Sequence, residues 1–180
     1  ILHSFPTRRS SDLAHRAAFM FRAYGHPDVR VLDGGLAKWK AEGKEVHSKK
    51  APHPKDEDFA FELKDTEIKQ FEDVVEISQK GTHQLIDCRP APGYQAGNIP
   101  SSVNVPAPSL ANPDGTLKSP EEIKVIFEKA GIDLSKPMVF TCGGGVMATV
   151  GKHAAEHAGA TGEKAVYDGS WGEYSVRAKQ

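Results

Sequence analysis

The C-terminal two thirds of the chain alternate between amphipathic segments and short apolar runs. Apolar residues at helical spacing, with capping residues such as Ser119-Pro120 at their starts, predict helices over 66–78, 120–130, 146–157 and 170–177. Short apolar runs between them predict strands over 84–87, 103–105, 138–141 and 165–167. Strands separated by helices predict an α/β fold with a mostly parallel sheet and helices on both faces.

The first third of the chain carries a shorter version of this pattern. Ala18, Phe21 and Tyr24 recur at helical spacing and predict a helix over 14–24 that ends at Gly25. A short strand over 29–32 and a helix over 36–41 are predicted to follow.

One motif occurs twice. Residues 29–39 match residues 164–174, because in both a short strand precedes Asp-Gly and an aromatic residue lies six positions after the aspartate. Asp33 and Asp168 are 168 − 33 = 135 positions apart. We therefore expect residues 13–48 to be the C-terminal remnant of a first domain, and residues 66–180 to be a second, complete domain of the same kind.

Two segments show neither the helical spacing of apolar residues nor the short apolar runs of strands. Residues 1–12 are aperiodic, rich in Arg and Ser, and lack the apolar core of a signal peptide, so we expect them to be non-native and disordered. Residues 49–65 are charged and contain prolines, which predicts a linker.

Charge and composition exclude several classes of function. The chain has 23 basic and 24 acidic residues, which argues against a nucleic-acid or membrane-binding surface. Its apolar runs are far shorter than the roughly 18–20 residues that a membrane span needs. Only two cysteines are present, so we expect no disulfide framework and a cytoplasmic or mitochondrial location rather than secretion.

Cys142 lies directly after a predicted strand and directly before three glycines. Gly143, Gly144 and Gly145 would let several backbone N–H groups point inward and form an anion-binding nest where the next helix begins. Such a nest, extending to Val146 and Met147, would stabilise a thiolate or a terminal persulfide. The pattern predicts that Cys142 is a nucleophile.

Other interpretations of the same residues are possible. Free cysteines are often buried for packing, so a structural role for Cys142 is the main alternative. We interpret Cys88 as a packing residue, or as a resolving thiol if it lies near Cys142. A cysteine phosphatase would need an arginine six residues after the cysteine, where this chain has Ala148. His153, Glu156 and His157 match a His-x-x-Glu-His zinc pattern, but no further ligand with suitable context follows, and we interpret them as a solvated helix face.

Several motifs, taken in order, resemble those of the tandem-domain sulfurtransferases of the rhodanese superfamily, of the mercaptopyruvate and thiosulfate types. The resemblance runs from Ala14 to the C-terminus. The matching stretches are 21–35, 87–89, 97–100, 104–106, 118–122, 133–137, 141–146 and 167–171.

This resemblance implies a rhodanese fold over 66–180 and a partial first rhodanese domain. It also implies that Cys142 takes a sulfane sulfur from 3-mercaptopyruvate or thiosulfate as a persulfide. A thiol acceptor such as thioredoxin or a low-molecular-weight thiol, or cyanide, would then remove the sulfur. No cofactor or metal is implied. We expect Asp87 and Arg89 to form a buried pair, and Asp168 and Ser170 to cap the last helix and brace the cysteine loop.

The chain departs from the family pattern at the substrate. Mercaptopyruvate-type relatives carry a serine where this chain has Gly144 and a threonine where it has Met147. Relatives also carry two arginines after the Asp-x-Arg motif to hold the substrate carboxylate, whereas residues 90–95 contain none. The neutral Gly143 and Gly144 are closer to the mercaptopyruvate type than to the thiosulfate type. The alternative is therefore a non-enzymatic or regulatory rhodanese-like module that carries persulfide or binds a partner protein.

Overall fold

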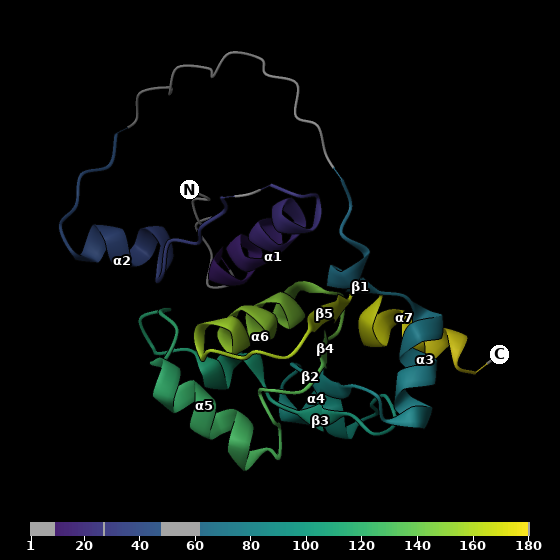
Figure 1. Cartoon of the computed structure of the whole chain (residues 1–180). Coiled ribbons are helices and arrows are strands. Elements are labelled where there is room, and N and C mark those ends of the chain that lie inside the picture. The colour runs from purple at the N-terminus through teal and green to yellow at the C-terminus, as the bar shows by residue number, and fades with distance from the viewer. Residues whose placement is uncertain (1–9, 27, 48–61, 180) are drawn as a thin grey trace.

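A computed structural model of the chain describes residues 10–26, 28–47 and 62–179 (Figure 1). At its centre is a five-stranded sheet in which every neighbouring pair is parallel. The strands lie in the order β1-β5-β4-β2-β3. Their bounds are β1 (Ile68–Lys69), β2 (Gln84–Asp87), β3 (Val103–Asn104), β4 (Met138–Thr141) and β5 (Lys164–Tyr167).

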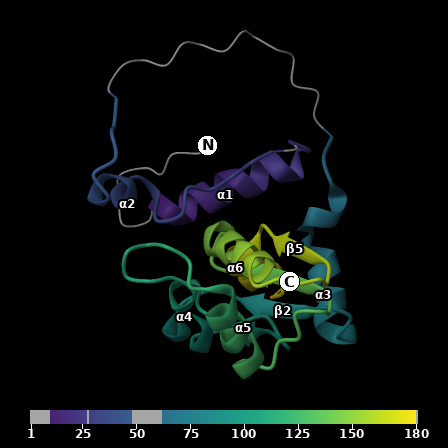
Figure 2. The same cartoon turned by 60° about the vertical axis from the view of Figure 1, so that its left-hand side comes forward.

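Seven α-helices and two 3-10 turns connect and cover these strands in the described part of the chain. The helices are α1 (Ser10–Ala23), α2 (Gly35–Ala41), α3 (Phe71–Lys80), α4 (Ala91–Gln95), α5 (Pro120–Lys129), α6 (Val146–His157) and α7 (Ser170–Arg177). The 3-10 turns are η1 (Asp65–Glu67) and η2 (Ala107–Leu110). Helix α1 lies along α6 in both views of the molecule (Figures 1 and 2).

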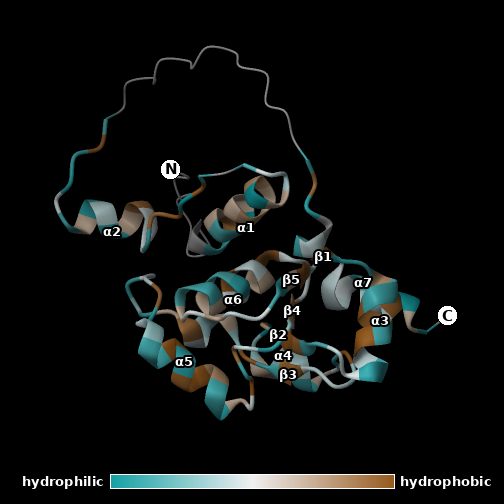
Figure 3. Ribbon diagram, viewed as in Figure 1, coloured by the Kyte–Doolittle hydropathy of each residue, from teal (hydrophilic) through white to brown (hydrophobic). Residues whose placement is uncertain are grey.

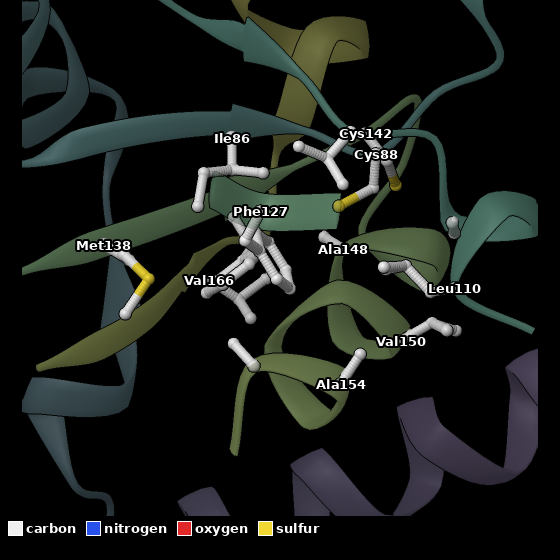
Figure 4. Close-up of a cluster of buried hydrophobic side chains, with 14 of the residues drawn as sticks. Ile86, Cys88, Leu110, Phe127, Met138, Cys142, Ala148, Val150, Ala154 and Val166 are labelled. Atoms are coloured by element: carbon white, nitrogen blue, oxygen red, sulfur yellow. The ribbon is translucent and has the colours of Figure 1, made fainter. Parts of the chain in front are cut away.

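Alternate residues of the central strands face two separate cores. Ile86, Phe140 and Val166 point into a cluster with α5, α6, η2 and α1, which includes both cysteines (Figure 4). Their strand neighbours Leu85, Val139 and Ala165 pack instead against α3 and α7. Because successive strand residues face opposite sides, a sheet that is apolar on both faces must be covered on both, as predicted.

The helices begin and end largely where their capping residues indicate. Ser119 and Glu122 form a reciprocal capping box at the start of α5, with Ser119 N donating to the Glu122 carboxylate at 3.0 Å. The predicted bounds of α6 and α7 are confirmed. Colouring by hydropathy shows one apolar and one polar side on α3 and α5 (Figure 3).

The predicted helix over 66–78 is wrong at its start. Residues 65–67 form η1, Ile68–Lys69 form β1, and α3 begins only at Phe71, with Gln70 as its N-cap. Ile68 lies opposite Val166 and Lys69 opposite Tyr167 in the parallel pairing with β5. Hydrogen bonding to a strand almost one hundred residues away overrides the local helical pattern.

The first segment, here residues 10–47, also departs from its predicted pattern in detail. The predicted strand over 29–32 is wrong, since only Val31 forms an isolated bridge. A strand needs a neighbour to receive its hydrogen bonds, and none of the described strands lies beside it. The helix over 36–41 is confirmed as α2, which is tied to the rest of the molecule by an ion pair of 2.9 Å between Lys38 and Asp114.

Helix α1 is confirmed but buries a different face from the one predicted. Ala18 is buried, whereas Phe21 and Tyr24 are 47% and 42% exposed. The face that packs against α6 instead carries Phe19 and Ala23. Apolar residues lie on more than one side of this helix, so their spacing alone does not select the buried side.

The two segments expected to lack regular structure lie mostly outside the described residues. Residues 1–9 and 48–61 are not described. Disorder is wrong for Ser10–Asp12, because α1 begins at Ser10. At the other side, Lys64 N donates to the Ala23 carbonyl at 2.8 Å, so the end of the expected linker contacts α1. Among the described helices, none is long and apolar enough to cross a lipid bilayer.

Candidate functional site

Cys142 lies at the carboxyl end of β4, a central strand of the sheet. In parallel α/β sheets this edge is where binding sites form. The cysteine is only 1% exposed, and its carbonyl accepts a hydrogen bond from Trp171 N at 3.0 Å. The next carbonyl, that of Gly143, accepts from Gly172 N at 3.0 Å. The first turn of α7 therefore holds the loop from one side.

The three glycines of the loop are not equivalent. Gly145 is the N-cap of α6 and has a φ of 77°, a left-handed conformation that favours glycine. Gly143 and Gly144 are exposed, have no such φ, and a Cβ placed on either would meet no atom within 4 Å. Of the three glycines that were expected to let the backbone curl, Gly145 is thus the one whose conformation requires a glycine. Val146 and Met147 follow in the first turn of α6, both half-buried.

Ser170 braces this loop from the start of α7. Its Oγ is fully buried and accepts hydrogen bonds from Cys142 N at 3.2 Å and Gly145 N at 3.1 Å. The hydroxyl donates in turn to the Tyr167 carbonyl at 2.9 Å and lies 4.0 Å from Cys142 Sγ. Ser170 has a φ of 54°, unusual for a residue with a side chain, so three hydrogen bonds stabilise a conformation that otherwise disfavours serine.

The expected capping role of Asp168 and Ser170 is wrong, and of the two residues it is Ser170 that forms hydrogen bonds to the loop. The N-cap of α7 is Gly169, with no side-chain capping bond. Asp168 instead binds Arg16, which comes from α1: Arg16 Nη1 donates to Asp168 Oδ1, and Nη2 donates to Oδ2 at 3.1 Å. Arg16 Nη1 also lies 3.5 Å from the Gly145 carbonyl.

Asp87 and Arg89 form the buried, mutually satisfied pair that was predicted. Asp87 is fully buried and accepts from Arg89 through the backbone N at 2.9 Å, from Nε at 3.0 Å and from Nη2 at 2.7 Å. Arg89 Nη2 also donates to the Gly97 carbonyl at 2.7 Å, and the guanidinium lies 4.9 Å above the Trp171 ring. These contacts occupy Arg89 and leave it a structural role beside the loop.

Cys88 lies in the same core as Cys142 (Figure 4). It is fully buried against Gly151 of α6, where a Cβ would overlap its sulfur. Burial raises the pKa of the Cys88 thiol well above its usual range, and the charges of Cys142 and Asp87 raise it further. A thiol that resists ionisation is a poor nucleophile, so the packing interpretation suits Cys88 better than a resolving role.

Two residues of the zinc-like pattern, His153 and Glu156, take part in the contact between α1 and α6, whereas His157 is exposed. His153 Nδ1 lies 3.6 Å from the Glu156 carboxylate, and its ring lies 4.9 Å from that of His15. Burial disfavours the charged form of Glu156, but His153, Lys152 and Arg22 outweigh this and lower its pKa to about 2. In the described ranges, no group of three His, Cys, Asp or Glu residues is arranged to hold a metal ion.

A cavity of about 280 Å³ lies beside the cysteine loop. It opens between α1, η2, the 111–117 loop and the first turn of α6, and Met147 and Val150 form one of its walls. A larger cavity of about 600 Å³ is lined by residues 131–135 and 158–161, at the amino ends of β4 and β5. The larger cavity lies at the opposite edge of the sheet from Cys142, whereas the smaller one reaches Met147, in the first turn of the helix that follows the cysteine loop.

The sequence interpretation missed Arg16 altogether. Its partner Asp168 is 152 positions away, so no local pattern links the two. One signal was present: Arg16 lies three and seven residues before Phe19 and Ala23, on the helix face that is buried. A charged residue on a buried face needs a partner, but the sequence does not indicate which carboxylate that partner is.

Comparisons with known proteins agree with this geometry. The sequence profile of the Rhodanese-like domain matches residues 70–176. The chain is 38% identical over 179 residues to 3-mercaptopyruvate sulfurtransferase of Mus musculus, covering 92% of this chain and 59% of the relative. It is 39% identical over 176 residues to thiosulfate sulfurtransferase of Gallus gallus, covering 92% of this chain and 60% of the relative.

The fold is also similar to that of a solved structure. SseA from Escherichia coli, a 3-mercaptopyruvate sulfotransferase of rhodanese fold, superposes with a TM-score of 0.79 at 31% sequence identity. The superposition covers 89% of this chain and 64% of SseA. The chain thus spans about three fifths of the length of the curated relatives it matches.

Proposed function

Since the chain belongs to the rhodanese-like domain family, we propose that it is a sulfurtransferase in which Cys142 carries a sulfane sulfur from a small donor to an acceptor. The observation that carries this proposal is the placement of Cys142: a buried cysteine at the end of a central strand, in a loop held by Ser170 and followed at once by the N-terminus of α6. That N-terminus favours negative charge, which both a thiolate and a persulfide possess.

The reaction has two displacement steps. In the first, the Cys142 thiolate attacks the sulfur of 3-mercaptopyruvate; the carbon–sulfur bond breaks, and its electron pair leaves with the enolate of pyruvate, which takes up a proton. With thiosulfate, the sulfur–sulfur bond breaks instead and sulfite leaves. In the second step an acceptor thiolate attacks the outer sulfur of the Cys142 persulfide, so that the cysteine thiolate is released and the acceptor becomes a persulfide. Cyanide as acceptor gives thiocyanate.

The loop favours 3-mercaptopyruvate over thiosulfate as donor. Gly143 and Gly144 place no cation beside the sulfur, which a dianionic donor would require. Recognition of the mercaptopyruvate carboxylate is weak, however, because Arg89 is occupied by Asp87 and the Gly97 carbonyl. We expect transfer of sulfur to Cys142 to be efficient only at high donor concentration, with small thiols or a thioredoxin-like protein thiol as acceptors.

Intact mass spectrometry of the full chain tests this proposal directly. Incubation with either donor is expected to add one sulfur, about 32 Da, which excess thiol then removes. Cys142→Ser is expected to abolish the adduct, and the matched control Cys88→Ser is expected to retain it.

Failure of both donors to add mass to Cys142 would contradict the proposal. If such a chain also bound a partner protein tightly, the module alternative would replace the enzyme. An adduct that persists in Cys142→Ser and disappears in Cys88→Ser would move the nucleophile to the other cysteine.

A further inference from the structure

We propose that Arg16, on α1, is a positioning residue for the Cys142 loop, so that α1 forms part of the catalytic unit. This inference rests on the proposed function and deepens it. It concerns residues 10–47, which contain the first copy of the repeated motif, and it assigns to that segment a definite task.

The contacts of Arg16 lead directly to the loop. Its two terminal nitrogens bind the two carboxylate oxygens of Asp168, the bidentate arrangement that gives an arginine–carboxylate pair its directional strength. Its Nη1 also reaches the carbonyl of Gly145, the N-cap of α6. The guanidinium is 23% exposed, and it lies 5.8 Å above the Phe19 ring of the same helix.

Gly145 is enclosed by this pair. A Cβ built on Gly145 would overlap the Asp168 carboxylate and would lie 3.0 Å from Arg16 Nη1. Gly145 N is bound at the same time by Ser170 Oγ, which also binds Cys142 N. Arg16 and Asp168 therefore fix one side of the N-cap while Ser170 fixes the other, and Cys142 shares the second anchor.

Loss of Arg16 would have two consequences. The N-cap of α6 would lose one of its two supports, and the Asp168 carboxylate would remain beside the loop without its cation. An uncompensated negative charge opposes the formation of another one nearby. Both the orientation of the thiolate and its formation should therefore suffer.

A second arginine on the same helix provides a control. Arg22 also joins α1 to α6, through an ion pair of 3.3 Å with Glu156, but it touches neither the loop nor Asp168. If α1 acts only by covering α6, then the loss of either arginine should have the same effect. If Arg16 positions the loop, only its loss should affect Cys142.

The experiment compares Arg16→Gln, Arg16→Lys, Asp168→Asn and Arg22→Gln in the full chain carrying Cys88→Ser, so that one thiol remains. Two rates are measured: alkylation of Cys142 by iodoacetamide from pH 5 to pH 10, and formation of the about 32 Da adduct with 3-mercaptopyruvate. Thermal unfolding of each variant, recorded in parallel, shows that the fold is retained.

Arg16→Gln is expected to slow adduct formation about 10- to 100-fold and to move its alkylation profile to higher pH. Arg16→Lys keeps the charge without the bidentate geometry, and should restore the alkylation profile while recovering only part of the adduct rate. Asp168→Asn should slow adduct formation without the upward move in pH, because it removes the carboxylate and leaves the Arg16 cation beside the loop. Arg22→Gln should stay within about twofold of the parent in both rates.

Equal losses in Arg16→Gln and Arg22→Gln, or no change in Arg16→Gln, would overturn the positioning role. If the parent chain forms no adduct with any donor, the proposed function fails; the alkylation profiles still decide the role of Arg16, because they require no sulfur donor.

Discussion

The molecule contains two copies of one Asp-Gly turn, and their environments differ. In the first copy Asp33 precedes Gly34 and Gly35, and in the second Asp168 precedes Gly169 and Ser170. The third residue of each copy is left-handed, with φ of 60° at Gly35 and 54° at Ser170. Each turn leads into a helix, α2 or α7. The middle residues differ, because Gly34 has a φ of 71° and Gly169 a φ of −60°. The repeat seen in the sequence therefore persists in the backbone only at the third residue.

Each aspartate forms a hydrogen bond that joins residues 10–47 to the rest of the chain. Asp33 Oδ1 accepts a hydrogen bond from Leu117 N at 2.9 Å, in the loop between η2 and α5. Asp168 binds Arg16 on α1. These two contacts hold residues 10–47 against the rest of the chain at two separate places.

The copies differ in what surrounds the turn and in one hydroxyl group. The strand before Asp168 is β5, paired on both sides within the sheet, whereas the residues before Asp33 form no strand. Glycine adopts the left-handed conformation at Gly35 without penalty, but serine at position 170 needs compensation. The second copy thus has an unfavourable backbone conformation at Ser170, whose hydroxyl reaches the Cys142 loop. The comparison teaches that the two copies share a left-handed third residue, and that the copy with a hydroxyl there contacts the cysteine loop.

Removal of that hydroxyl should have the largest effect. Ser170→Ala deletes three hydrogen bonds and leaves the Cys142 and Gly145 N–H groups unpaired, so we expect unfolding free energy to fall by about 3 kcal/mol. Ser170→Gly deletes the same bonds but relieves the left-handed backbone, and should lose about 1 kcal/mol less. Urea denaturation measures both. Values for Ser170→Ala within about 0.5 kcal/mol of the parent would show that the hydroxyl does not brace the loop.

Acidification should selectively weaken the contact of α1 with the rest of the chain. Burial, together with the nearby charges of His153 and Arg22, lowers the pKa of His15 on α1 to about 4. Between pH 6.5 and pH 4 the unfolded chain binds a proton at His15 that the folded chain does not, so stability falls as pH falls. From pH 7 to pH 4.5 we expect a loss of about 2 kcal/mol from this residue.

The measurement is urea denaturation of the parent and of His15→Leu across this pH range. Glu156, whose pKa is lowered to about 2, loses its stabilising charge only below about pH 4.5. Burial also lowers the pKa of His83, so the difference between the parent and His15→Leu, and not the parent profile alone, reports His15. An equally steep pH dependence in His15→Leu would show that other groups cause it.

Disruption of the first copy should have the smallest effect. Asp33→Ala removes one exposed hydrogen bond to Leu117 N, so we expect at most about 1 kcal/mol of lost stability. The rate of Cys142 alkylation should not change, because the Asp33–Leu117 hydrogen bond does not touch the cysteine loop. A change in that rate comparable to the one expected for Asp168→Asn would make the two copies functionally equivalent and would break the comparison.

Much of the fold could be predicted because its signals are local. The capping box at Ser119 and the glycine before Val146 lie next to the helices they begin, and the apolar runs of β2, β4 and β5 are bounded by polar or turn residues. The strand β1 could not be predicted, since two residues carry no periodicity and its partner Val166 is distant in the sequence. For the same reason the buried side of α1 is set by α6 and not by its own composition.

The candidate site divides in the same way. Short motifs predict three features of the site, because the residues of each motif are adjacent or belong to a repeated turn. These features are Cys142, the Asp87–Arg89 pair and the bracing by Ser170. The partner of Asp168 could not be found, because a carboxylate in a sequence does not indicate which of 23 basic residues it will meet. The glycine loop was predicted by composition, but which glycine has the left-handed φ was a matter of geometry.

The openness of Gly143 and Gly144 bears on how such an enzyme can diversify. Neither position supports packing, and neither needs glycine for its backbone. Side chains can therefore be exchanged there without a penalty to folding, while the anchors at Gly145 and Ser170 keep the sulfur in place. If Cys142 is the nucleophile that we propose, we expect a hydroxyl or a cation introduced at either position to change donor preference in a single step. The proposed nucleophile is then held by fixed anchors, whereas the residues beside it are free to vary.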